Sequence, residues 1–253
     1  MGYIGNLTIT TNNGTINLQN RGLINNVNSY TYQGGTTNTQ NSGTINSFNT
    51  NNNNANVNTA NTGYIGSINS SNYAGNTNIA STGTINNITA SNVGGNVNIA
   101  NAGVVSNFSA NNAFSGNLNL ANAGFLGSSS IFNRSLGNVV VENQGAINNL
   151  NTDTQRAHTS IGNFGSVNTL NAKDQWDDTG IYNQGSINLA NLIANGAKGY
   201  VGFQNAGSVN TLNADANYGG IIDINNTAGL ISNFFADASG ASHGQKSQIN
   251  VLS

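Results

Sequence analysis

One aliphatic position recurs along the chain at intervals of 20 to 22 residues. It lies two residues after a glycine, as in Gly22-Leu23-Ile24, and holds isoleucine, valine or leucine in all twelve copies. The positions are Ile4, Ile24, Ile45, Ile65, Ile85, Val105, Leu126, Ile147, Val167, Ile187, Val209 and Ile231. A fixed period of this length is the signature of a solenoid, in which each repeat forms one turn of a coil.

A second apolar position follows five residues after the same glycine in ten copies, with Ser129 and Ala190 as the exceptions. Its members are Leu7, Val27, Phe48, Ile68, Ile88, Phe108, Leu150, Leu170, Leu212 and Phe234. Before the glycine, pairs such as Val97 and Ile99 alternate with polar residues, a spacing that predicts half-buried β-strands and not helices.

A repeat of about 20 residues is too short to bury its apolar side chains alone, so equivalent positions must stack on neighbouring repeats. Crossovers between parallel strands are nearly always right-handed. The sequence therefore predicts an all-β fold, a right-handed parallel β-helix of about twelve rungs of 20–22 residues. We expect residues 1–253 to form a single β-solenoid domain.

Asparagine repeats in phase with the apolar positions. Two residues before the glycine it forms one column: Asn20, Asn41, Asn61, Asn101, Asn122, Asn143, Asn163, Asn183 and Asn205. Ser81 replaces asparagine in one copy of this column. Five residues before the glycine lies a second column: Asn17, Asn38, Asn58, Asn78, Asn98 and Asn119. Stacked amides can bond to the rungs above and below, so we interpret both columns as structural. The alternative is a flat neutral array that orders ice or glycan.

The composition narrows the classes of function. Charged residues make up only 6% of the chain, the net charge is −2, and there is no proline or cysteine. The absence of cysteine excludes disulfides and thiolate metal sites, and we predict no cofactor. Without a basic patch or a long apolar segment, the sequence favours neither a nucleic-acid partner nor membrane insertion.

Charged side chains other than Arg21 all lie from Arg134 onward. Stacking would bring several of them to one edge, and we name these candidate ligand-edge residues: Asp153, Asp174, Trp176, Asp177, Asp178, Asp215 and Tyr218. Such an edge can keep neighbouring sheets apart, bind a glycan or protein through its aromatic residues, or supply the paired carboxylates of a carbohydrate-active enzyme.

The acidic residues of this edge do not predict a catalytic site or a metal site. Asp174, Asp177 and Asp178 fall in one local segment and lack the ligand spacing of a calcium loop. His158 and His243 are too many rungs apart to share a metal ion. We therefore predict neither a catalytic site nor a metal site.

The repeat Asn-Gln-Gly-Ala-Ile-Asn-Asn-Leu, from Asn143 to Leu150, resembles the passenger repeats of vacuolating-cytotoxin-like and haemagglutinin-like autotransporters of Gram-negative bacteria. The resemblance covers almost the whole chain. It implies a right-handed β-helix exported to the bacterial cell surface, with roles in adhesion, colonisation or self-association. It carries over no catalytic residue.

The two ends of the sequence match each other in phase. Ile249-Asn250-Val251 repeats the pattern of Val97-Asn98-Ile99, and joining this segment to the start of the chain continues the period. The self-assembly residues expected from this match are Gly2, Tyr3, Ile4, Leu7, Ile249, Asn250 and Val251. Either the chain is a fragment of a longer passenger, or it is a subunit that pairs head to tail.

These features together predict a non-enzymatic, extracellular structural protein. We expect it to be a subunit of a surface fibre built by head-to-tail stacking, or an adhesin stalk. Its expected partners are further copies of itself and a host or environmental glycan or surface protein. The alternatives are a passenger fragment that binds a host glycan or protein, and a carbohydrate-active β-helix that uses the acidic edge.

Overall fold

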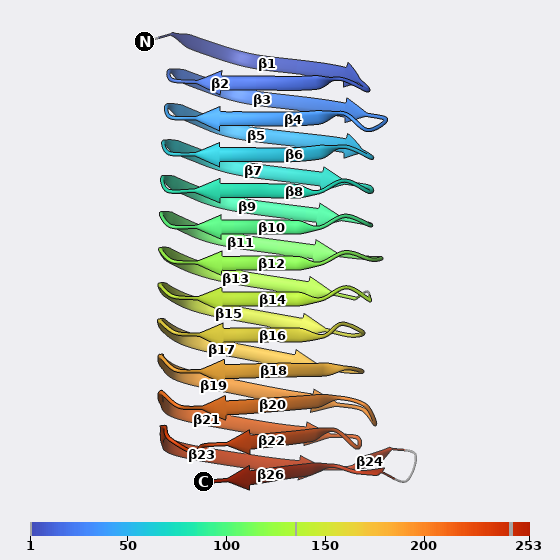
Figure 1. Cartoon of the computed structure of the whole chain (residues 1–253), viewed down its shortest axis with the longest axis vertical. Coiled ribbons are helices and arrows are strands. Elements are labelled where there is room, and N and C mark those ends of the chain that lie inside the picture. The colour runs from blue at the N-terminus through green and yellow to red at the C-terminus, as the bar shows by residue number, and fades with distance from the viewer. Residues whose placement is uncertain (1, 135, 243–244) are drawn as a thin grey trace. The chain divides into compact units, whose positions relative to one another are not determined.

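The computed structural model describes residues 2–134, 136–242 and 245–253. These residues fall into two compact units, Met1–Gly127 and Ser128–Ser253. In each unit the chain runs along one parallel sheet, turns, and returns along a second (Figure 1). About twelve such coils follow one another along the sequence. The predicted all-β parallel solenoid is confirmed, whereas the expectation of a single domain stays a prediction.

The first unit contains two sets of parallel strands. The first set, sheet A, pairs in the order β1 (Tyr3–Asn12), β3 (Leu23–Tyr32), β5 (Thr44–Asn53), β7 (Tyr64–Asn72), β9 (Thr84–Asn92) and β11 (Val104–Asn112). The second set, sheet B, pairs in the order β2 (Thr15–Asn20), β4 (Thr36–Asn41), β6 (Asn56–Asn61), β8 (Thr77–Ser81), β10 (Val97–Asn101) and β12 (Leu118–Asn122). Strand β13 (Phe125–Asn133) contains the boundary between the units.

The second unit repeats this arrangement. Its sheet A strands are β15 (Ala146–Thr154), β17 (Ser166–Asp174), β19 (Ser186–Asn195), β21 (Ser208–Asn217) and β23 (Leu230–Ser239). Its sheet B strands are β14 (Val139–Asn143), β16 (Thr159–Asn163), β18 (Asp178–Asn183), β20 (Tyr200–Asn205), β22 (Ile221–Asn225) and β26 (Gln248–Leu252). A small antiparallel pair, β24 (Ala241–Ser242) and β25 (Gln245–Lys246), precedes β26. Among the described residues, no helix could span a membrane.

The repeated glycine allows successive coils to approach closely at the corner before each sheet A strand. A Cβ atom on Gly63 would lie 2.2 Å from the carbonyl oxygen of Gly43, and one on Gly165 would lie 2.1 Å from that of Gly145. Neither glycine has a positive φ. Glycine is therefore required here because a side chain would collide with the preceding coil.

The two apolar columns form the core. Ile45, Ile65 and Ile85 are completely buried, because each lies between equivalent side chains of the coils on either side. Ser129 and Ala190, the two exceptions in the second column, are also completely buried. Burial of apolar area favours stacking of equivalent residues, and this stacking continues along each unit.

The asparagine column before the glycine is a buried hydrogen-bonded ladder. The Nδ2 atom of Asn41 donates to Oδ1 of Asn61 at 2.9 Å, and also to the corner carbonyls of Gly43 and Tyr64. In the second unit Asn143 donates to Asn163, and Asn163 to Asn183, at 2.8 and 2.7 Å. The predicted ladder is confirmed, and its amides also donate to carbonyl oxygens of the corner, which ties neighbouring coils together.

Candidate functional site

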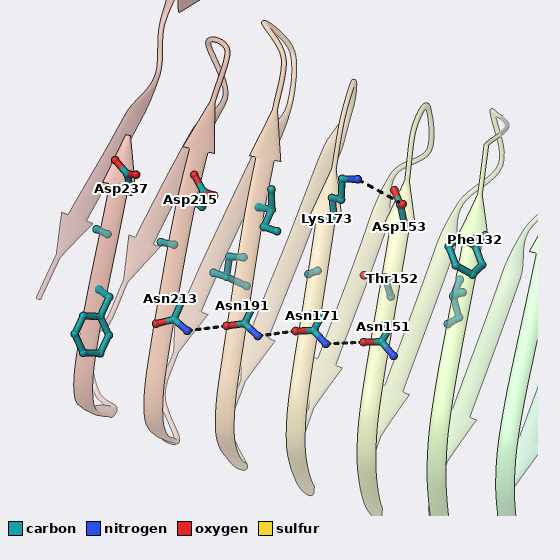
Figure 2. A pocket seen from close by; sticks show the side chains of 17 residues that line it. Phe132, Asn151, Thr152, Asp153, Asn171, Lys173, Asn191, Asn213, Asp215 and Asp237 are labelled. Atoms are coloured by element: carbon teal, nitrogen blue, oxygen red, sulfur yellow. Dashed lines mark hydrogen bonds and ion pairs between the residues drawn. The ribbon is translucent and has the colours of Figure 1, made fainter. Parts of the chain in front are cut away.

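A groove of about 640 Å³ lies on the outer face of sheet A in the second unit (Figure 2). Side chains alternate across this sheet, so every second residue of each strand faces the groove while its neighbours face the core. Two columns of such outward residues, two positions apart along the strands, form its sides. We call this site the sheet A groove.

The first column is a ladder of four asparagines. Three of them donate from Nδ2 to Oδ1 of the ladder asparagine in the preceding coil: Asn213 to Asn191 at 2.7 Å, Asn191 to Asn171 at 2.6 Å, and Asn171 to Asn151 at 2.5 Å (Figure 2). Asn151 ends the ladder by donating to the carbonyl oxygen of Ser129. Each ladder amide has two N–H donors and uses one of them along the ladder, so the other is directed away from the stack.

The second column carries charge. Strand pairing places Asp153, Lys173, Ile193, Asp215 and Asp237 at equivalent positions of five successive coils. The Nζ atom of Lys173 lies 3.7 Å from Oδ2 of Asp153. Among the described residues, Oδ1 of Asp153 and Oδ1 of Asp215 have no hydrogen-bond donor. Both Oδ1 atoms are themselves buried, so the remaining carboxylate oxygens, together with the Asp237 carboxylate, are the acceptors at the groove surface.

Apolar side chains complete the lining. Phe132 of β13 and Phe235 of β23 line opposite ends, and both are substantially exposed. Ile193 lies in the charged column between Lys173 and Asp215. The site combines apolar surface with hydrogen-bonding groups, as small-molecule sites generally do.

Asp174 is not part of an exposed edge. It is completely buried at the end of β17, where its Oδ1 accepts hydrogen bonds from the backbone N–H groups of Trp176 and Asp177. Its Oδ2 accepts one from the Thr179 hydroxyl. Burial raises the pKa of Asp174 to about 6, although these hydrogen bonds act in the opposite direction. These hydrogen bonds stabilise the turn between β17 and β18.

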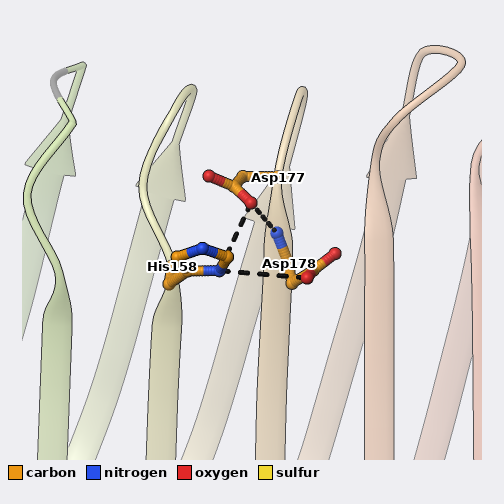
Figure 3. Close-up of side chains that lie close together, drawn as sticks. All are labelled: His158, Asp177 and Asp178. Atoms are coloured by element: carbon orange, nitrogen blue, oxygen red, sulfur yellow. Dashed lines mark hydrogen bonds and ion pairs between the residues drawn. The ribbon is translucent and has the colours of Figure 1, made fainter.

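Asp177 and Asp178 meet His158 from the preceding coil (Figure 3). The Nδ1 atom of His158 lies 3.3 Å from Oδ1 of Asp177 and 3.8 Å from Oδ2 of Asp178. These three side chains are the described residues that could hold a divalent cation. His158 and Asp178 are largely exposed, so their ion pairing contributes little stability.

The candidate ligand edge is thus divided among several places. Asp153 and Asp215 line the sheet A groove, whereas Trp176 and Tyr218 are exposed in separate turns and do not. A carbohydrate-active site built from Asp174, Asp177, Asp178 and Trp176 would need these residues to line a common groove, and none of them lines this one. His243 lies outside the described residues.

Sequence reasoning missed several residues of the groove. Ile193 and the asparagine ladder are recognisable only when the repeats are aligned and the outward positions of sheet A are compared coil by coil. Phe132 and Phe235 gave no signal of their own, because an aromatic residue in a strand is more often part of the core.

No protein-family model, curated protein or solved structure matches this chain. The resemblance of its repeats to autotransporter passengers therefore stays a prediction from the sequence.

Proposed function

We propose that this chain is a non-enzymatic structural protein of the bacterial surface, a fibre subunit or adhesin stalk whose solenoid continues from one molecule to the next. The observation that carries the proposal is the chemistry of two open strand edges. One edge belongs to β1 and β2, and the other to β23 and β26. Both edges display core columns, and their strands carry a single charged residue, Asp237, and no proline.

The β1 and β2 edge exposes residues that are buried in other coils. Ile4 is 43% exposed, whereas its equivalent Ile24, one coil later, is 2% exposed. Tyr3 is largely exposed, and Leu7 is partly exposed. This difference arises because the strand has a neighbour on only one side.

The β23 and β26 edge is exposed in the same way. Phe234, in the second apolar column, is 40% exposed, while its partner Leu212 is completely buried. Ile249 and Val251 pair with the buried Ile222 and Ile224 and continue those columns to the edge. Asn250 faces outward and donates to Asp223.

The two edges carry little of the usual protection against pairing. Charged side chains, proline and bulges are common on natural edge strands because they block further pairing. The strands β1, β2 and β26 contain no charged residue and no proline, and Asp237 is the one charged residue of β23. These edges are therefore suited to accept another strand.

The columns match across such a junction. If the register of the coils continued, Ile231 of one molecule would lie beside Ile4 of the next, Phe234 beside Leu7, and Ile249 beside Ile16. Burial of these apolar pairs, together with a new row of backbone hydrogen bonds, would stabilise the junction. An interface that repeats head to tail in this way generates an open filament and not a closed ring.

Electron microscopy and sedimentation velocity of the purified 253-residue chain over a dilution series test the proposal. We expect filaments that the double variant Ile249→Lys, Val251→Lys abolishes while its circular dichroism remains that of a β-solenoid. Ser109→Lys, on the outer face of β11, adds a lysine away from both edges and should leave the filaments intact. Monodisperse particles at all concentrations, or filaments unaffected by the double variant, would contradict stacking.

The surface location is tested separately. Protease accessibility of the chain on intact cells of the bacterium that makes it should match that of a known surface protein. Protection from the protease until the cells are lysed would contradict an extracellular role.

A further inference from the structure

We propose that the sheet A groove binds an uncharged glycan chain. This inference does not depend on stacking at the strand edges, because it concerns the outer face of the second unit. It rests on three properties of the groove: the carboxylate and amide groups that line it, the apolar surface beside them, and the sign of the local charge.

The hydrogen-bonding groups of the groove call for a ligand rich in hydroxyl groups. The Asp215 side chain is partly exposed at the groove, although its Oδ1 atom is itself buried and has no donor among the described residues. A ligand hydroxyl can donate to the other oxygen of Asp215, or to the carboxylate of Asp237, which lines the same groove. On the opposite side, the ladder amides of Asn171 and Asn191 each have an N–H group beyond the one used in the ladder. A hydroxyl can donate to one side and accept from the other.

The apolar lining suits the C–H faces of sugar rings. Ile193 interrupts the charged column at its middle, with Lys173 on one side and Asp215 on the other. Phe132 and Phe235 present exposed rings at the two ends of the groove. An aromatic ring buries a large apolar area when a flat ligand surface packs on it. Pyranose rings combine such apolar faces with a rim of hydroxyl groups. Free polyols lack the flat apolar face, and simple hydrocarbons lack the hydroxyl groups.

The charge of the groove selects against acidic sugars. Its lining contains the carboxylates of Asp153, Asp215 and Asp237, against the single ammonium of Lys173. That ammonium already lies 3.7 Å from Asp153, so it is not available as a free cation. A uronic acid or sulfated sugar would bring like charge against the unpaired Asp215, which is unfavourable. An uncharged glycan avoids this cost.

The direction of the groove suits an extended chain. The charged column runs across five successive strands from Asp153 to Asp237, which spans about 19 Å at the usual spacing of about 4.8 Å between strands. A monosaccharide would occupy only a fraction of that distance. We therefore expect affinity to increase with the length of the oligosaccharide.

The first unit provides a natural comparison. The register positions equivalent to the charged column there are occupied by uncharged residues, Tyr30, Asn51, Ser71, Ser91 and Asn111. The hollow on that face is smaller, about 330 Å³. The unpaired carboxylates and the isoleucine are thus particular to the second unit.

Isothermal titration calorimetry with defined sugars tests the inference. The neutral probes are hexamers of β-1,4-linked glucose and of β-1,4-linked N-acetylglucosamine, and the acidic probe is a galacturonate hexamer. We expect saturable binding of at least one neutral hexamer, tighter than that of its monosaccharide, and at least tenfold weaker binding of the galacturonate. Absence of saturable binding for both neutral hexamers, or a preference for galacturonate, would overturn it.

Variants locate the binding. Ile193→Arg should reduce affinity at least tenfold by filling the groove, and the isosteric Asp215→Asn should reduce it severalfold. Ser91→Arg places the same side chain at the equivalent column of the first unit and should leave affinity unchanged. If Ile193→Arg does not fold, Phe235→Ala at the exposed end of the groove serves in its place. Binding that survives these groove substitutions would place the sugar elsewhere and refute the proposal.

Discussion

The hydroxyl of Thr179 donates a hydrogen bond of 3.1 Å to Oδ2 of Asp174 inside the second unit. This contact joins the last residue of β17 to the start of β18 across a tight turn. The residue at the same position of the repeat is asparagine in several coils of the first unit, including Asn72, Asn92 and Asn112. Asp174 is therefore a carboxylate in a place built for a neutral amide.

Stability should depend on pH through Asp174. Its pKa is raised from 3.8 to about 6 in the folded protein, chiefly by burial. The folded state thus holds this proton more tightly than the unfolded state. The resulting stabilisation is complete below pH 3.8 and is lost as the pH rises through about 6.

Asp174→Asn should remove that dependence. The amide keeps an acceptor for the N–H groups of Trp176 and Asp177, and it offers a donor to the Thr179 hydroxyl. We expect the variant to be more stable than the parent by about 2 kcal/mol at pH 7 and nearly equal to it at pH 4. Urea unfolding at both pH values measures this difference. A variant that is less stable at pH 7 would show that the ionised carboxylate itself stabilises the turn.

Removing one amide from the buried ladder should be costly. Asn163→Ala removes the acceptor that Asn163 offers to the Asn143 amide, and it removes the donor to Oδ1 of Asn183 and to the Ser186 carbonyl oxygen. Buried polar groups left unpaired cost roughly 1–3 kcal/mol each, so we expect a loss of about 3 kcal/mol in the free energy of unfolding. Asn171→Ala, in the outer ladder, is the matched control and should cost less than about 1 kcal/mol, because water can replace its partners. Equal losses in urea unfolding would contradict the distinction between the two ladders.

The corner glycine should not tolerate even a methyl group. A Cβ on residue 165 would lie 2.1 Å from the Gly145 carbonyl oxygen, so Gly165→Ala must separate two coils. Overpacking of this kind typically costs about 1–3 kcal/mol. At Gly180 the nearest atom to an added Cβ is 3.9 Å away, and Gly180→Ala should be nearly neutral. The midpoints of thermal unfolding compare the two variants, and a stable Gly165→Ala protein would argue against the close approach of the coils.

The exposed contact between His158 and Asp177 should contribute little to the fold. Both side chains are accessible to solvent, and such pairs typically contribute 0–1 kcal/mol. His158→Ala should therefore change the free energy of unfolding at pH 7 by less than about 1 kcal/mol. A larger loss in urea unfolding would indicate that this group has a structural role beyond its ion pairing.

The site was less predictable than the fold. The candidate ligand edge grouped residues by the expected stacking of coils, and it assigned Asp174 to the same exposed edge as Asp177 and Asp178. In the structure Asp174 is buried, because successive residues of a strand point to opposite faces and its position faces the core. Asp153 and Asp215 do share a groove, although 62 residues separate them, because stacking places equivalent positions in one column.

The sequence by itself determined the coil. Its aliphatic columns, corner glycines and asparagine ladder repeat at a period that only stacked parallel strands can bury, so the strands and the core followed from local pattern. Tertiary structure alone decided which outward residues meet, since their neighbours lie one coil away and are chosen by register. Ile193, for example, is recognised as part of the groove only because register places it between Lys173 and Asp215. Burial forces the inward positions to repeat, whereas contact with water leaves the outward positions free to vary.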